Sequence, residues 1–289
     1  MSLDNKNIGK KQFFTKEEND AIASAHGKPN CGHYHVYAIE VKPKDKTSQP
    51  YLLLILAEAL YRALEILFSL LALLLTLPIM IIEAIIIRID SPGPILFFHK
   101  RAGRSVPTLG RKLVDRDDLK PEGDTFDPDK YYYVPSSFHF VKFRTMYQDA
   151  LQKHPEYYWW KYDLDQEQLK NMYYKLEDDP RVTRLGKWFR KTTLDELPNF
   201  WNVLTGDMRL VGPRPEACEI LRFYTPEQLL KFTVKPGITC LSKIHGRGNL
   251  SFQEQVFWDV KYVKTRSLRL DLKILFKTFW LIIMGKGAF

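Results

Sequence analysis

The chain has 289 residues, of which 45% are hydrophobic and 27% charged, and it carries a formal net charge of +9. A chain of this length can bury one core of ordinary size, and a mean hydropathy of −0.28 excludes a multi-span transporter. The excess of lysine and arginine favours anionic partners such as phospholipid head groups, nucleotide sugars or nucleic acid. Three scattered cysteines predict no disulfide framework, which fits a reducing compartment.

The chain starts with a polar segment, residues 1–50, that lacks the apolar core of a signal peptide. We expect this segment to be a weakly ordered arm. Residues 51–90 are almost continuously apolar, and we interpret them as a membrane helix. As one straight helix, residues 52–87 would be about 54 Å long, whereas the hydrocarbon core of a bilayer is ~30 Å thick.

Two features of residues 51–90 favour a re-entrant helix that enters and leaves the membrane by one face. Pro78 removes an internal hydrogen bond, so we expect a kink at residues 74–78. Basic residues occur on both flanks, and positive charge marks the cytoplasmic side. A kinked spanning helix is the alternative. Near the start of the segment, the helical spacing of three charged residues predicts one polar face: Glu58, Arg62 and Glu65.

Residues 91–289 are interpreted as one cytosolic α/β domain, helix-rich and irregular, with a small sheet. Residues 91–94 predict a turn that ends the membrane helix, and residues 95–98 a short strand. Residues 104–137 are rich in Asp, Lys, Pro and Gly, which predicts a surface insertion. We interpret residues 131–133 and 138–143 as two strands that pair with each other.

Residues 270–284 predict a C-terminal amphipathic helix. The apolar face of this helix comprises Leu272, Leu275, Phe276, Phe279, Ile282 and Ile283. Such a helix can lie in the membrane interface with its lysines toward anionic head groups. Docking of the same face onto the protein core is an equal alternative.

The most informative run is residues 180–216, which places Asp195 and Glu196 among five arginines. Thr193 and Glu196 have the spacing of a capping box, so we expect both carboxylates in the first turn of a helix. Free backbone N–H groups favour negative charge there. A carboxylate pair among guanidinium groups suits phosphate chemistry, whereas an ordinary capped helix with balanced charges is the alternative interpretation.

Several short motifs occur in a consistent order along the chain: Ser91-Pro-Gly-Pro, Phe143-Arg-Thr-Met, Thr193-Leu-Asp-Glu-Leu-Pro, Gly206-Asp-Met, Val211-Gly-Pro-Arg-Pro, Lys235-Pro-Gly-Ile-Thr and His245-Gly-Arg. Their order resembles that of the bacterial sugar transferase family over residues 60–284. Members of this family are monotopic phosphoglycosyl transferases. The resemblance implies an enzyme on the inner membrane, with its catalytic domain on the cytoplasmic face.

The implied reaction transfers a sugar phosphate from a nucleotide diphosphate sugar, such as a UDP-sugar, to undecaprenyl phosphate. It starts the assembly of a glycan such as an exopolysaccharide or O-antigen, through a covalent phosphosugar–aspartyl intermediate and with Mg²⁺. The resemblance makes Asp195 the nucleophile and Glu196 its partner, with both acids holding the metal. It associates four basic residues with phosphate or substrate binding: Arg190, Arg214, Arg247 and Lys142.

Plain structural roles are the alternatives for three of these basic residues. Arg190 is also compatible with a surface salt bridge, Arg247 with an ordinary turn, and Lys142 with a solvated strand position. Arg214 lies between two prolines, which fix the direction of its side chain, so we favour a functional role.

The chain departs from the family pattern at two places. Leu77 precedes Pro78 where the family usually has serine, although the hydroxyl of Thr76 lies one residue earlier. Residues 240–243 read Cys-Leu-Ser-Lys where the family commonly has Gly-Trp-Ala-Gln. Because this region is expected to shape the donor pocket, the resemblance does not identify the sugar.

Two other classes of function are compatible with the same residues. A membrane-attached, metal-dependent phosphohydrolase would use the same acids and arginines. A non-catalytic basic scaffold would bind anionic lipid and lose affinity steeply with salt. The chain has no aromatic and basic RNA-binding motif, so we expect no nucleic-acid partner. A homo-oligomer is compatible with the sequence.

Overall fold

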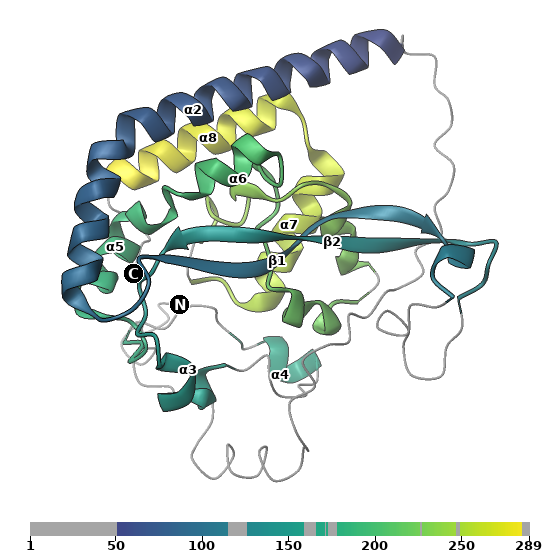
Figure 1. Cartoon of the computed structure of the whole chain (residues 1–289). Coiled ribbons are helices and arrows are strands. Elements are labelled where there is room, and N and C mark those ends of the chain that lie inside the picture. Colours follow the sequence, from purple (N-terminus) through teal and green to yellow (C-terminus); the bar gives the residue numbers. More distant parts are fainter. Residues whose placement is uncertain are drawn as a thin grey trace, which may run out of the picture.

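The computed structural model describes residues 51–114, 126–158, 166–170, 172, 178–225, 227–246 and 249–284. The long helix α2 (Tyr51–Asp90) lies along one side of a helix-rich body with two small sheets (Figure 1). The predicted helix-rich fold with little sheet is therefore confirmed. The predicted arm, residues 1–50, lies outside the described residues.

Helix α2 bends along its length (Figure 1) and contains Pro78. The hydroxyl of Thr76 donates a hydrogen bond of 2.6 Å to the carbonyl of Ala72, four residues earlier. Such back-bonding tends to bend helices. Because Pro78 has no backbone N–H, the carbonyl of Leu74 lacks its usual helical donor. The hydroxyl of Thr76 does not replace this donor, because it bonds to Ala72. Within the described chain, Leu56–Asp90 is the one helix long and apolar enough to cross a membrane.

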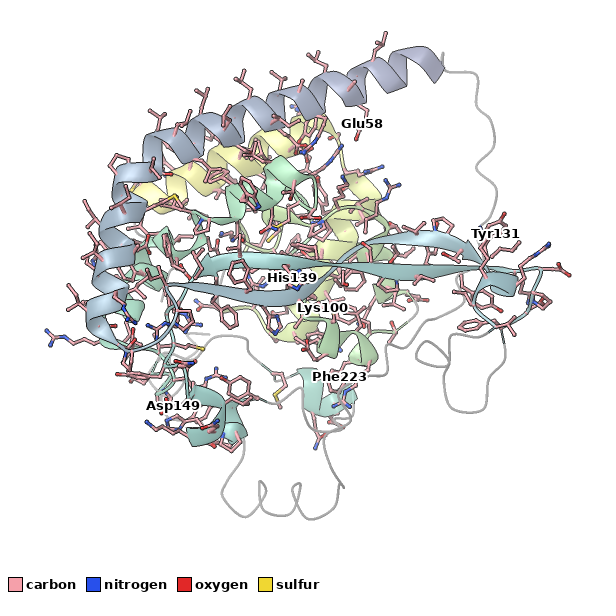
Figure 2. The ribbon with its side chains drawn as sticks, viewed as in Figure 1. Glu58, Lys100, Tyr131, His139, Asp149 and Phe223 are labelled. Carbon is pink, nitrogen blue, oxygen red and sulfur yellow. The ribbon has the colours of Figure 1, made fainter. Side chains whose placement is uncertain are left out.

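The predicted polar face of α2 is confirmed, and it contacts the body. Glu58 forms an ion pair with Arg209, the first residue of β3 (Arg209–Val211). The buried carboxylate of Glu65 accepts a hydrogen bond of 2.9 Å from the N–H of Leu210. Figure 2 shows side chains projecting from the outer side of α2, with Glu58 toward the body. The helix is thus attached to β3 by charge and exposes its apolar side.

Strands β1 (Leu96–Leu109) and β2 (Tyr131–Phe143) form an antiparallel hairpin. The predicted pairing of residues 131–133 with 138–143 is wrong, because both segments belong to β2 and pair with β1. Pro135 interrupts the strand pattern between the two segments, so the sequence indicated two separate strands. It pairs next to a register irregularity in β1, where a strand tolerates proline. Tyr131 marks the far end of the hairpin, away from the body (Figure 2).

The other elements are mostly short. Strand β3 pairs in parallel with β4 (Gly237–Thr239). The helices and 3₁₀ turns are η2 (Gly110–Lys112), α3 (Ala150–Lys153), η4 (Pro155–Tyr157), α4 (Gln166–Lys170), α5 (Arg184–Thr192), η6 (Leu194–Glu196), α6 (Asn199–Thr205), η7 (Cys218–Phe223), η8 (Gln228–Thr233), α7 (Phe252–Thr265) and α8 (Leu268–Ile283). Helix α7 begins with a complete capping box, in which Ser251 and Glu254 bond each other's backbone N–H. A cluster of buried side chains around Phe252 packs this helix against η7 and η8.

Helix α8 lies beside α2 (Figure 1), and the hydroxyl of Tyr61 in α2 donates a hydrogen bond of 3.2 Å to Asp271. Ile274 and Thr278 are buried on the body side of α8. Most of the predicted apolar face is instead exposed: Leu272, Phe276, Phe279, Ile282 and Ile283. The helix therefore docks through Ile274 and Thr278 together with Leu275, the one member of the predicted face that packs against the core. The location of that face in a membrane interface stays a prediction.

A buried charge network lies between η8 and α7. The ammonium of Lys231 is 3.0 Å from Asp259 and 3.5 Å from Glu216, and each of these side chains is at most 1% exposed. The carboxylate of Asp259 also accepts the N–H of Arg214 at 3.2 Å and the hydroxyl of Ser242 at 3.1 Å. Asp259 of α7 thus links the segment around Arg214 to the segment around Ser242.

Candidate active site

Asp195 and Glu196 lie in η6, a single 3₁₀ turn between α5 and α6. The predicted capping box is wrong. Thr193 adopts a left-handed conformation with φ of 65°, and its side chain makes no capping hydrogen bond. A capping residue needs an extended backbone, which Thr193 does not have. Among the described residues, Thr193 is the one non-glycine with positive φ, and such conformations cluster at functional sites.

The carboxylate of Asp195 is buried, with 6% of the residue exposed. The ammonium of Lys142 in β2 lies 3.9 Å from one of its oxygens. The guanidinium of Arg190 in α5 also acts on the charge of Asp195 and lies 3.8 Å from Asp179. Burial lowers the pKa of Lys142 to about 8, while the charge of Asp195 opposes this shift. At neutral pH, Lys142 is therefore mainly a cation.

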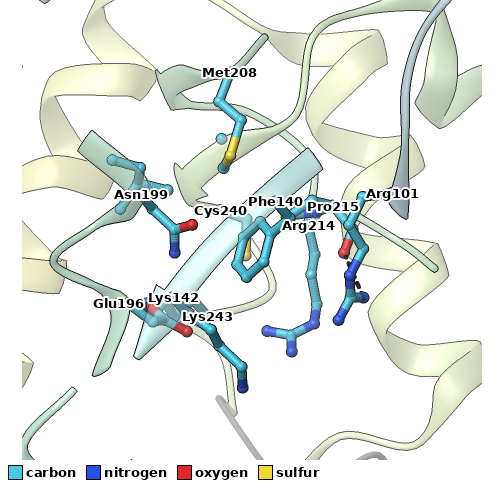
Figure 3. A pocket seen from close by; sticks show the side chains of 12 residues that line it. Arg101, Phe140, Lys142, Glu196, Asn199, Met208, Arg214, Pro215, Cys240 and Lys243 are labelled. Atoms are coloured by element: carbon cyan, nitrogen blue, oxygen red, sulfur yellow. Dashed lines mark hydrogen bonds and ion pairs between the residues drawn. The ribbon is translucent and has the colours of Figure 1, made fainter. Parts of the chain in front are cut away.

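Glu196 is held by a residue from the segment 240–243, which was expected to shape the donor pocket although none of its residues was assigned a role. The ammonium of Lys243, in the turn after β4, lies 2.8 Å from its carboxylate. Figure 3 shows Glu196, Lys142 and Lys243 together at one end of a cavity. Each acid of the pair thus has its own lysine.

The cavity beside these acids is small and strongly cationic. Its volume is about 50 Å³, which is room for a few water molecules. One carboxylate, Glu196, lines it together with four basic side chains: Arg101, Lys142, Arg214 and Lys243. Convergent positive charge in a partly desolvated site favours a phosphate group over a neutral ligand.

The structure brings some of the predicted basic residues to this site. Arg214 and Lys142 line the cavity, and Arg190 lies beside Asp195. Arg190 is half-buried between two acids, so its surroundings differ from those of a surface salt bridge. Arg247 lies outside the described residues.

The other arginines of the run 180–216 have partners elsewhere or face solvent. Arg181 forms two hydrogen bonds, of 2.8 and 2.7 Å, with the carboxylate of Asp179. Arg209 pairs with Glu58 of α2, and Arg184 is exposed. Of the five arginines in the run, Arg190 and Arg214 lie near the acids, whereas Asp179 and α2 each take up one guanidinium.

Three residues near the acids were missed in the sequence. Arg101 and Lys243 line the cavity, but neither was assigned a role from the motifs. Glu83 of α2 is buried, the charge of Asp195 acts on it, and neither of its carboxylate oxygens has a hydrogen-bond partner among the described residues. The signal for Glu83 was visible, because it is the one acid in an otherwise apolar stretch, residues 66–87.

The site contains two adjacent carboxylates as candidate ligands for a divalent cation. In the described chain, no group of three or more His, Cys, Asp or Glu residues is placed to hold a metal. Magnesium is commonly held by one or two carboxylates together with phosphate oxygens of the substrate. Asp195 and Glu196 fit that mode of binding, in which part of the coordination comes from the ligand.

Comparison with known proteins gives matches over most of the chain. The model of the family described as bacterial sugar transferase matches residues 56–110 and 126–285. The galactosyl transferase CpsE of Streptococcus agalactiae is 43% identical over 152 residues, which are 52% of this chain and 32% of that protein. The undecaprenyl-phosphate glucose phosphotransferase of Komagataeibacter xylinus is 33% identical over 79% of this chain and 36% of its own length. The exopolysaccharide production protein ExoY of Sinorhizobium fredii is 30% identical over 79% of this chain and 87% of its own length. The chain thus spans about a third of the length of the first two relatives and most of the length of the third.

Proposed function

Because this chain belongs to the bacterial sugar transferase family, we propose that it transfers a sugar phosphate from a nucleotide diphosphate sugar to undecaprenyl phosphate. Relatives named as undecaprenyl-phosphate glucose and galactose phosphotransferases support this reaction class. The observation that carries the proposal is the small cationic cavity that Glu196 and Lys142 line, with Asp195 only 3.9 Å from Lys142. The product would start the assembly of a polysaccharide.

The proposed chemistry has two displacements at one phosphorus atom. In the first, a carboxylate oxygen of Asp195 bonds to the phosphorus that carries the sugar. The bond from this phosphorus to the bridging oxygen breaks, and the nucleoside monophosphate leaves with the electron pair. In the second, a phosphate oxygen of the lipid acceptor bonds to the same phosphorus and releases Asp195. Such covalent catalysis divides one difficult transfer into two steps and gives ping-pong kinetics.

The surrounding cations have defined tasks in this scheme. Lys142, 3.9 Å from Asp195, reduces the repulsion between the carboxylate and the diphosphate. Arg214 lines the cavity, and Asp259 anchors its backbone N–H, so its guanidinium would stabilise phosphate oxygens bound there. When bound, Mg²⁺ would be held by Asp195 and Glu196 and would neutralise charge on the diphosphate.

Exposed apolar surface supports a location at the membrane. The outer side of α2 and the adjacent side of α8 expose large side chains that include Leu75, Ile89 and Phe276. Soluble monomers rarely expose contiguous apolar surface on this scale, which marks a membrane or partner contact. We place α2 as a re-entrant helix in the inner membrane, with the catalytic body on the cytoplasmic face. The lipid acceptor is then close to Asp195, while the nucleotide sugar arrives from water.

The test is Asp195→Asn in the full chain, assayed with a panel of nucleotide sugars. The wild type incubated with donor alone should gain the mass of a sugar phosphate, and the Asn variant should not. Nucleoside monophosphate should be released continuously only when polyprenyl phosphate is present. Asp207→Asn, which changes an acid outside the cavity, is the matched control.

Three results would contradict the proposal in different ways. Full activity of Asp195→Asn would remove the nucleophile. Steady release of nucleoside monophosphate without acceptor would favour the phosphohydrolase. Salt-sensitive lipid binding without any turnover, equal in wild type and Asp195→Asn, would favour the scaffold.

A further inference from the structure

Lys243 lies at a position where the sequence departs from the family pattern, and it contacts the proposed catalytic pair. Its ammonium is 2.8 Å from the carboxylate of Glu196, and its side chain is 13% exposed. It lines the same cavity as Arg214 and Lys142. Lys243 therefore occupies one of the two acids that are proposed to hold the metal.

The backbone around Lys243 is fixed, so its long side chain is the movable part. The hydroxyl of the preceding residue, Ser242, donates a hydrogen bond of 3.1 Å to Asp259, which is fully buried. The ring of His245 stacks on Trp258 with 3.7 Å between centroids and 13° between planes. The turn is therefore held on both sides of Lys243. A lysine side chain carries a compact charge on a flexible chain of four carbons, so it can exchange one anionic partner for another.

We propose that Lys243 binds the diphosphate of the donor, and that in the donor-free protein Glu196 holds Lys243 in the cavity. This inference rests on the proposed function. A diphosphate carries more negative charge than one carboxylate, so its arrival moves the ammonium from Glu196 to a phosphate oxygen. The move leaves a carboxylate oxygen of Glu196 accessible to a divalent cation that enters with the donor. Lys243 thereby couples metal binding at Glu196 to the presence of donor.

The proposal predicts two effects of opposite sign for Lys243→Gln. Binding of a diphosphate weakens because a cation is lost from the cavity. Binding of a divalent cation to the donor-free protein tightens because Glu196 no longer holds an ammonium group. A residue with a purely structural role would weaken both when it is replaced. The opposite signs therefore separate coupling from damage to the fold.

The experiment uses the full chain in detergent micelles, with inorganic pyrophosphate and Mn²⁺ as separate probes. Pyrophosphate binding is measured by calorimetry without metal, and Mn²⁺ binding by electron paramagnetic resonance without pyrophosphate. Lys243→Gln should weaken pyrophosphate binding about tenfold or more and tighten Mn²⁺ binding severalfold. Lys243→Arg should keep pyrophosphate binding near the wild-type value. Lys191→Gln, an exposed lysine at the end of α5, is the matched control.

Unchanged pyrophosphate affinity in Lys243→Gln, or weaker binding of both probes, would overturn the inference. Neither probe contains a sugar or a lipid, so the two readouts stand apart from sugar transfer. A protein that releases no nucleoside monophosphate from any donor, yet shows the opposite shifts, would contradict the proposed function and leave the role of Lys243 supported.

Discussion

Replacing Lys231 by methionine tests whether the buried charge network stabilises the fold. Lys231 lies 3.0 Å from Asp259 and 3.5 Å from Glu216, and all three side chains are at most 1% exposed. Methionine fills a similar volume but leaves two carboxylates in the interior without their cation. Breaking a buried ion pair by removing one partner typically destabilises a fold by about 3–5 kcal/mol. For a chain of this size, this corresponds to a fall in melting temperature on the order of 10 °C.

The assay is thermal unfolding of the full chain in detergent micelles, followed by circular dichroism. Burial raises the pKa of Asp259, so the folded protein holds this proton more readily than the unfolded chain. Stability from such a group falls as the pH rises through the raised pKa. The charge of Lys231 lowers the pKa of Asp259, so removal of Lys231 raises this pKa further and enlarges the loss of stability with rising pH. Lys231→Met should therefore be less destabilised in acid than at neutral pH. Lys231→Met with Asp259→Asn should recover part of the loss, because one buried charge is then absent.

The exposed Lys191→Met is the control and should unfold close to the wild-type temperature. If Lys231→Met unfolds at the same temperature as this control, the network does not support the fold, and the reasoning is refuted. A loss that is the same at all pH values would refute the role given to Asp259.

Three further predictions concern the site, the membrane face and a helix end. Because burial lowers the pKa of Lys142 to about 8, its positive charge is lost as the pH rises through that value. Calorimetric affinity for pyrophosphate should fall in the same range, and in Lys142→Arg the fall should move to higher pH; a flat profile in the wild type would contradict this. Phe276→Asp on the exposed side of α8 should reduce flotation with anionic vesicles severalfold, whereas Val106→Asp on the exposed hairpin should not. Equal loss in both variants would argue against α8 as a membrane contact. Gly206 ends α6 with φ of 87°, so Gly206→Ala should lower the free energy of unfolding by roughly 1 kcal/mol in denaturant titrations. An unchanged midpoint would show that the turn adapts.

Local patterns in the sequence predicted the parts of the fold that depend on nearby residues. The spacing of Glu58, Arg62 and Glu65 predicted a polar face on α2, and the structure uses that face to contact the body. The long hairpin was not predicted, because Pro135 divides β2 into two apparent strands and the partner of both is β1. Pairing between distant segments leaves little trace in local composition.

In the site, too, features set by neighbouring residues could be predicted, whereas contacts between distant segments could not. The adjacency of Asp195 and Glu196 is a property of the sequence, and the family resemblance associated Lys142 with phosphate binding, whereas the contact of Lys142 with Asp195 is visible only in the structure. The capping box failed because threonine with glutamate three residues later is also compatible with a left-handed Thr193 between two helical segments. The contact of Lys243 with Glu196 depends on how β4 is placed against η6, which no spacing along the chain encodes.

The charged attachment of α2 to the body has a mechanical consequence. Glu58 and Glu65 fasten the helix to β3, β3 pairs with β4, and Gly237 and Ile238 of β4 line the cavity. A helix in a bilayer tilts to match the thickness of the hydrocarbon layer. We expect that a tilt of α2 in a bilayer would be transmitted through β3 and β4 to Gly237 and Ile238, so that the acyl-chain length of the host lipids would change the width of the cavity.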